Sequence, residues 1–214
     1  MLRQTVCRAS WLCMVVLLNG ARAGDAAHEE FDSVLRIQPD AAHGQRLFDT
    51  CAACHGNNGA GATDGTIPSI AGQHFRVVAG ELVDFRHDRR WDERMQNFTD
   101  KHHLEGARDV ADVAYYISRM PPVRVNREHA PSGRLIEDSY ARRCASCHGA
   151  KAEGDNLKRV PRLAGQHREY LLAQFHYIAE GRRPNSAASH GQLFRNLGQA
   201  DSVDLAGYLS TLEP

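Results

Sequence analysis

The sequence predicts an all-α protein made of two similar domains in tandem. Residues 51–110 match residues 144–203 at a constant offset of 93 positions, without gaps. A repeat of this length indicates two whole domains, because the units of a stacked solenoid are shorter. Apolar residues recur at helical spacing in both copies, and the alternating patterns typical of strands are scarce. The 214 residues suffice for two small domains.

Composition and charge narrow the class of protein further. The chain is 42% hydrophobic and 24% charged, which is typical of a globular protein and argues against a disordered or fibrous one. Its 26 basic and 26 acidic residues balance. Proteins that bind nucleic acid normally have a basic excess, so we expect no nucleic-acid partner.

Residues 1–23 are predicted to be a secretory signal peptide. Arg3 and Arg8 form a basic start, residues 11–18 form a short apolar run, and residues 21–23 have the A-x-A cleavage pattern. The run is too short to span a bilayer, which needs about 20 apolar residues, and the cleavage pattern argues against an uncleaved anchor. Cleavage would leave 23 basic and 26 acidic residues, and we expect a periplasmic product.

The remaining chain divides into four parts. These are an N-terminal tail at residues 24–37, a first domain at 38–120, a linker at 121–131 and a second domain at 132–214. The linker is rich in proline, which favours an extended chain. Asp40 is placed to cap a helix that leads into the first cysteine pair. Further helices are expected at residues 73–87, 106–118, 167–180 and 201–212.

Every cysteine outside the predicted signal peptide belongs to one kind of motif. These cysteines are Cys51, Cys54, Cys144 and Cys147, and each pair is completed by His55 or His148 to give C-x-x-C-H. This is the attachment motif of c-type haem, in which two thiols bond to the porphyrin and the histidine is the proximal iron ligand. The sequence therefore predicts two covalently bound haem c groups.

Two other sites use paired cysteines. A structural zinc site does not require a histidine directly after each second cysteine, yet both copies have one. A redox-active dithiol would not explain two copies of the motif. Haem attachment accounts for the spacing, the duplication and the export signal together.

The repeat continues beyond the cysteines. Pro68 corresponds to Pro161, and the A-G-Q-H segment at residues 71–74 recurs at residues 164–167. Two C-x-x-C-H-G motifs, each followed by P-x-x-A-G-Q and a C-terminal helix with a tyrosine, resemble the dihaem cytochrome c4 family. The resemblance covers nearly all of the chain after the signal peptide. It implies two tandem class I cytochrome c domains, each wrapped around one covalent haem.

The resemblance also implies a periplasmic carrier of single electrons in a respiratory chain, and not an enzyme. The expected partners are redox proteins, namely an upstream dehydrogenase or quinol-oxidising complex and a downstream terminal oxidase. Peripheral association with the membrane is compatible with this role. In such domains a methionine in the loop before the last helix is usually the distal iron ligand.

The first copy supplies that methionine, and the second does not. Met95 is the methionine of the first loop, and we expect it to be a ligand. The second copy has no methionine after Met120, but His190 lies close to the required place. The gapless repeat pairs Met95 with Ala188, two residues before His190. We expect His/Met coordination for haem 1 and His/His coordination for haem 2.

Other arrangements at haem 2 stay open at this level. They are an open or water-bound iron, His176, His167, or Met120 reaching over from the linker. For His74 and His167 a structural hydrogen-bonding role is the better interpretation. The repeated pairs Arg89-Arg90 and Arg182-Arg183 would either bind haem propionates or face solvent.

Unequal axial ligands predict unequal potentials. Methionine favours the ferrous state more than a second histidine does, so haem 1 would have the higher potential. Electrons would enter through the second domain and leave from the first. The alternatives are the cytochrome subunit of a dehydrogenase, such as a sulfide-oxidising flavocytochrome, or a peroxidase-like enzyme with an open second haem.

Overall fold

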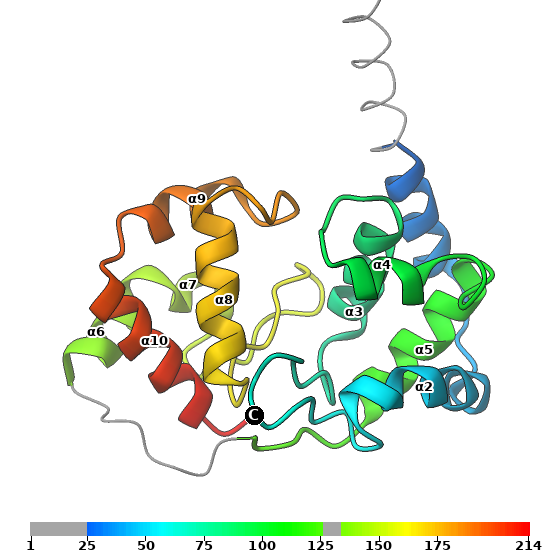
Figure 1. Cartoon of the computed structure of the whole chain (residues 1–214), viewed down its shortest axis with the longest axis horizontal. Coiled ribbons are helices and arrows are strands. Elements are labelled where there is room, and N and C mark those ends of the chain that lie inside the picture. Colours follow the sequence, from blue (N-terminus) through cyan, green and yellow to red (C-terminus); the bar gives the residue numbers. More distant parts are fainter. Residues whose placement is uncertain (1–24, 126–133) are drawn as a thin grey trace, which may run out of the picture.

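The computed structural model describes residues 25–125 and 134–214, which form two helical domains side by side (Figure 1). The predicted signal peptide, and residues 126–131 of the predicted linker, lie outside the described residues. Within the described ranges no β-strand forms apart from one isolated bridge between Asp155 and Val160, so the predicted all-α class is confirmed. None of the helices in these ranges is long and apolar enough to cross a membrane.

Domain 1 contains four helices after its N-terminal segment: α2 (Ala41–His55), α3 (Phe75–Arg86), α4 (Glu93–Thr99) and α5 (Ala107–Arg119). Asp40 caps α2 as expected, because its side chain accepts hydrogen bonds from the backbone N–H groups of Ala42 and His43. Gly44 lets α2 approach α5 closely, since a Cβ there would lie 2.0 Å from the carbonyl oxygen of Asp112. The buried face of α5, with Val110 and Val113, forms the centre of the core.

The segment predicted as a loose N-terminal tail is instead helical. Residues 25–36 form a helix, and its Ala27 and Val34 are only 2% and 0% exposed within the first-domain core. Glu30 of this helix forms ion pairs with Arg86 and His87 at the end of α3. The expectation was wrong because this helix gains most of its stability from packing on the domain.

Domain 2 contains α6 (Arg134–Arg143), α7 (Ala145–His148), α8 (Arg168–Ala179), α9 (Ala188–Arg195) and α10 (Gln199–Thr211). The helices expected at 73–87, 106–118, 167–180 and 201–212 are confirmed as α3, α5, α8 and α10. The short helices α4 and α9 were not expected. Leu205 and Leu209 of α10 are buried in the second core, and Val110 and Val113 of α5 are buried in the first.

The two domains are joined by hydrogen bonds that obey an approximate two-fold relation. The Gln73 side chain donates to the carbonyl oxygen of Arg162 at 3.0 Å and accepts from its N–H at 3.0 Å. Gln166 forms the same pair of bonds with Ser69, at 2.8 and 2.9 Å. Because Gln73 corresponds to Gln166 and Ser69 to Arg162 in the repeat, the two copies contact each other reciprocally.

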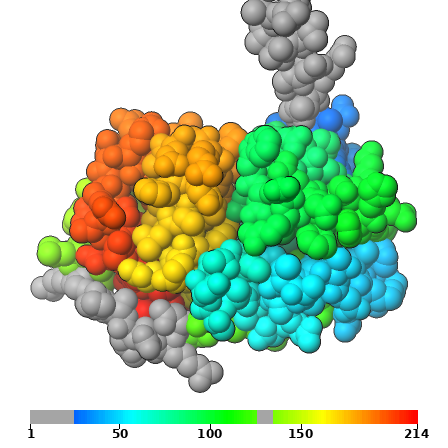
Figure 2. Space-filling view, in the orientation of Figure 1, coloured from blue at the N-terminus to red at the C-terminus, as the bar shows by residue number. Residues whose placement is uncertain are grey.

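The histidines that follow these glutamines extend the same relation. His74 Nε2 donates to the carbonyl oxygen of Glu153, and His167 Nε2 donates to that of Ala60, both at 2.8 Å. Ala60 and Glu153 are again equivalent positions. The structural role expected for both histidines is confirmed, and the repeated A-G-Q-H segment is the contact between the domains. On the face shown in Figure 2 the two domains meet along a continuous boundary.

A charged cluster completes the boundary and is centred on Glu81. Arg90 and Arg183, which are equivalent, donate to the two carboxylate oxygens of Glu81 at 2.6 and 2.9 Å. Both arginines also donate to Oε1 of Gln174, the equivalent of Glu81, at 3.1 and 2.9 Å. Arg90 and Arg183 therefore do not face open solvent. Their hydrogen bonds to Glu81 and Gln174 link the two domains.

Candidate haem-binding sites

The two C-x-x-C-H motifs have the same local geometry. Each motif ends a helix, and Gly56 or Gly149 follows the histidine with φ of 75° or 82°, a conformation that favours glycine. The chain can therefore turn sharply after each histidine. The four cysteines of the motifs are free thiols and form no disulfide. They are thus available for covalent attachment.

The motif histidines are buried and oriented by a proline carbonyl. Nδ1 of His55 donates to the carbonyl oxygen of Pro68 at 3.0 Å, and Nδ1 of His148 donates to that of Pro161 at 3.1 Å. Each of the two histidines is only 7% exposed. With the proton on Nδ1, Nε2 is the unprotonated nitrogen that binds a metal, and the carbonyl fixes the ring. Sequence analysis found the repeated prolines but not this role.

Burial sets the protonation states in both sites. It lowers the pKa of His55 and of His148, although the proline carbonyls oppose this shift. Burial also raises the pKa of the Cys51 thiol to about 11 and raises the pKa of Cys144. The imidazoles are therefore neutral, which is the form that ligates iron.

Met95 lies at the start of α4, on a helix fixed by its cap. The Asp92 side chain accepts hydrogen bonds from the N–H groups of Arg94 and Met95 at 3.1 and 3.2 Å. Asp92 and Arg94 both influence the pKa of His55, so the start of α4 lies near the motif histidine. Met95 is half-buried and is the third residue of its helix.

His190 takes the same place in the second domain. It is the third residue of α9, because α9 begins two positions later in the repeat than α4 does. This shift explains why the gapless repeat pairs Met95 with Ala188 although His190 has the matching helical position. The ring centroids of His190 and His148 are 6.0 Å apart, with an angle of 26° between their planes. That separation leaves room for one metal ion with bonds of about 2 Å to each ring.

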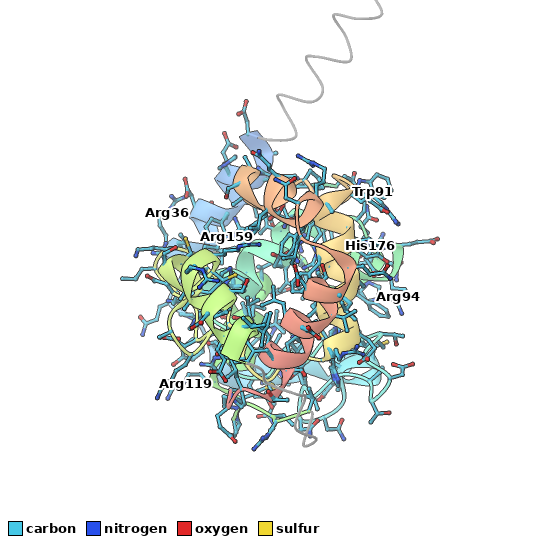
Figure 3. All side chains as sticks on the ribbon, turned by 90° about the vertical axis from the view of Figure 1, so that its left-hand side faces the viewer. Arg36, Trp91, Arg94, Arg119, Arg159 and His176 are labelled. Atoms are coloured by element: carbon cyan, nitrogen blue, oxygen red, sulfur yellow. The ribbon has the colours of Figure 1, made fainter. Side chains whose placement is uncertain are left out.

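The other side chains considered for haem 2 lie elsewhere. His176 is exposed on α8 and appears at the molecular surface in Figure 3. Nε2 of His167 is engaged by Ala60, as described above. Met120 is 8% exposed and belongs to the first-domain core.

An unpaired hydrogen-bond donor lies at the boundary between the domains. Arg162 follows Pro161, and its Nη1 is buried without a hydrogen-bond partner among the described residues. Burial lowers the pKa of this guanidinium, which would be stabilised by an acidic group. The porphyrin of haem c carries two propionates, which are acceptors of this kind. The free thiols and the neutral imidazoles of both motifs match haem c, and the unpaired nitrogen of Arg162 is a donor that a propionate within reach would satisfy.

Comparison with known proteins identifies the domains. The family model described as Cytochrome c matches residues 41–121 and again residues 136–213. The chain belongs to the cytochrome c family. This cytochrome is 29% identical to cytochrome c4 of Azotobacter vinelandii over 197 residues, which cover 81% of this chain and 89% of the relative.

Two further similarities support this identification. A thiosulfate dehydrogenase electron acceptor of Stutzerimonas stutzeri strain A1501 is 28% identical over 204 residues, covering 79% of this chain and 93% of the relative. The crystal structure of reduced recombinant cytochrome c4 from Pseudomonas stutzeri matches with a TM-score of 0.72. It covers 82% of this chain and 100% of that one at 24% identity, which shows the fold alone.

The expected resemblance is therefore confirmed. This cytochrome consists of two cytochrome c domains in tandem, as in cytochrome c4, and it is a dihaem electron-transfer protein of that type. The expectation of two covalently bound haem c groups is confirmed by the same findings. Its relatives also imply redox proteins as partners.

Proposed function

We propose that this cytochrome carries single electrons between periplasmic redox proteins, using two haems with different axial ligands. Cys51 and Cys54 would attach haem 1, with His55 as its proximal ligand. Cys144 and Cys147 would attach haem 2, with His148 in the same role. The proposal is supported by the free thiols and by the orientation of both histidines towards metal binding. The features of residues 1–23 support export.

The distal ligands would be Met95 for haem 1 and His190 for haem 2. The observation that carries this assignment is the position of His190 opposite His148, with ring centroids 6.0 Å apart. Its place as third residue of α9, like that of Met95 in α4, gives it independent support. Burial lowers the pKa of His190, so its imidazole is available in the neutral form.

The two ligand sets would give the domains different tasks. When bound, haem iron alternates between the ferrous and ferric states and so takes up and releases one electron. The thioether of Met95 favours the ferrous state more than the imidazole of His190 does. Electrons would therefore enter through domain 2 and leave from domain 1. The reciprocal contacts of Gln73 and Gln166 would hold the two sites in a fixed relation.

Near-infrared magnetic circular dichroism of the ferric protein tests the ligand assignment, because each haem reports its own axial pair. We expect one His/Met signal and one His/His signal of equal intensity. Two His/Met signals would contradict the assignment of His190. A high-spin signal would mean that the second iron is open, and it would favour the peroxidase-like alternative.

The relative named as a thiosulfate dehydrogenase electron acceptor favours one class of electron donor. We propose a thiosulfate-oxidising dehydrogenase as a donor to this cytochrome. The measurement is haem reduction after thiosulfate is added to the ferric cytochrome, with and without a purified thiosulfate dehydrogenase. We expect reduction only with the dehydrogenase. Reduction by thiosulfate alone at a catalytic rate would indicate an enzyme and contradict the carrier function.

A further inference from the structure

An aromatic stack lies against His190 in the second domain. The ring centroid of Phe194 is 6.0 Å from that of His190, with an angle of 48° between the planes. The two residues are four positions apart on α9 and therefore share a helix face. Phe194 in turn stacks on Phe175 of α8, with centroids 4.5 Å apart and planes within 17°. Phe175 is 7% exposed and anchored in the second-domain core.

The first domain has no equivalent of this stack. Phe175 corresponds to Leu82, and in the helix register that matches His190 to Met95, Phe194 corresponds to Thr99. Thr99 is the last residue of α4 and carries no aromatic ring. The two phenylalanines therefore occur only in domain 2, where α9 carries His190.

The helix α9 also lacks the cap that fixes α4. Asp92 accepts two hydrogen bonds at the start of α4, whereas Ala187 at the start of α9 has no side-chain acceptor. The start of α9 is thus held less firmly by its own residues. Stacking of Phe194 on Phe175 ties α9 to α8 at the turn that follows His190. The stack of Phe194 on Phe175 therefore holds α9 in place where a capping side chain is missing.

We propose that Phe194, held by Phe175, is a positioning residue that sets the plane of the His190 ring relative to His148. This inference rests on the proposed ligation of haem 2 by His190. An imidazole bound through one nitrogen is free to rotate about that bond unless a neighbour restrains it. The tilted ring of Phe194 beside His190 restrains this rotation and keeps the two imidazole planes close to parallel, as the angle of 26° indicates.

Electron paramagnetic resonance of the ferric protein reads this angle directly. Nearly parallel imidazole planes give a rhombic low-spin spectrum with three resolved g values, and perpendicular planes give a spectrum dominated by one large g value. We expect the rhombic type for haem 2 of the unaltered protein. Phe194→Leu keeps an apolar side chain but removes the ring, so its signal should broaden and its largest g value should rise.

Ligand exchange gives a second readout. Cyanide binds ferric haem 2 only after His190 dissociates, so loss of the ring contact should speed cyanide binding by roughly two- to tenfold, the factor expected for one aromatic pair. Phe175→Leu introduces the residue that the first domain has at this position, and it should act in the same direction. Phe194→Tyr retains the ring and should keep the original g values and rate. Phe98→Leu in α4 is the matched control and should leave haem 2 unchanged.

The outcomes separate the two proposals. If the unaltered protein lacks a bis-imidazole signal, the ligation by His190 is wrong and the positioning role is wrong with it. If that signal is present but Phe194→Leu and Phe175→Leu leave the g values and the cyanide rate unchanged, only the positioning role is overturned. Should Phe194→Leu fail to fold, the Phe175→Leu and Phe194→Tyr pair decides between the same two results.

Discussion

Replacing His190 with methionine is expected to raise the midpoint potential of haem 2 by on the order of 100 mV, a fraction of the roughly 0.8 V range over which axial ligands set haem potentials. A thioether stabilises the ferrous state relative to imidazole. The substitution suits the site, because position 190 has the same place in α9 that Met95 has in α4. A potentiometric titration followed by haem absorbance should show the two midpoints converging.

The reciprocal substitution is the matched control. Met95→His should lower the potential of haem 1 and leave that of haem 2 nearly unchanged. His190→Ala should leave the second iron without a protein ligand on its distal side, which gives a high-spin ferric signal and carbon monoxide binding at that haem alone. An unchanged potential in His190→Met would show that His190 is not the ligand.

The features that sequence analysis predicted correctly are those fixed by local sequence. The C-x-x-C-H motifs and the apolar periodicity of α3, α5, α8 and α10 are each contained within a short stretch of chain, and the 93-residue repeat follows from comparing such stretches. The cap of α2 by Asp40 is equally local. Each of these signals depends on neighbours in the sequence, so no knowledge of the tertiary structure was needed.

The two-residue shift of α9 relative to α4 could not be predicted from such local signals. The gapless repeat pairs Met95 with Ala188, and only the observed start of α9 shows that His190 has the matching position. Asp92 marks the start of α4 as a recognisable cap, but Ala187 gives no such signal for α9. The shift of two residues is therefore visible in the structure and hidden in the alignment of the two copies.

Contacts between elements far apart in the chain also could not be predicted from the sequence. The spacing of Ala27, Phe31 and Val34 is helical and could have indicated the N-terminal helix, but its burial depends on the domain that it covers. The repeat shows that Gln73 and Gln166 are equivalent, yet it does not show that each contacts the other domain. A repeat predicts that the two domains have similar folds. It does not predict which residues form the interface between them.

Glu81→Gln is expected to lower the free energy of unfolding by about 3 kcal/mol, the cost of removing one partner of a largely buried ion pair. The carboxylate of Glu81 accepts from Arg90 and Arg183, which belong to different domains. Glutamine would leave these guanidiniums together without a shared negative charge. Chemical denaturation of the haem-loaded protein measures the loss. The double variant Glu81→Gln with Gln174→Glu is the matched control, since it moves the carboxylate to the equivalent position and should restore much of the stability.

Acidification should reproduce the effect of Glu81→Gln in the unaltered protein. Burial opposes ionisation of Glu81, but Arg90 and Arg183 outweigh it and hold the pKa of the carboxyl far below its usual range. A group whose pKa is lower in the folded state adds stability above its unfolded pKa of about 4.3, and this contribution is lost as the pH falls below that value. The free energy of unfolding should therefore fall more steeply between pH 7 and pH 3 in the unaltered protein than in Glu81→Gln. Equal slopes would contradict a charged Glu81 as the link between the domains.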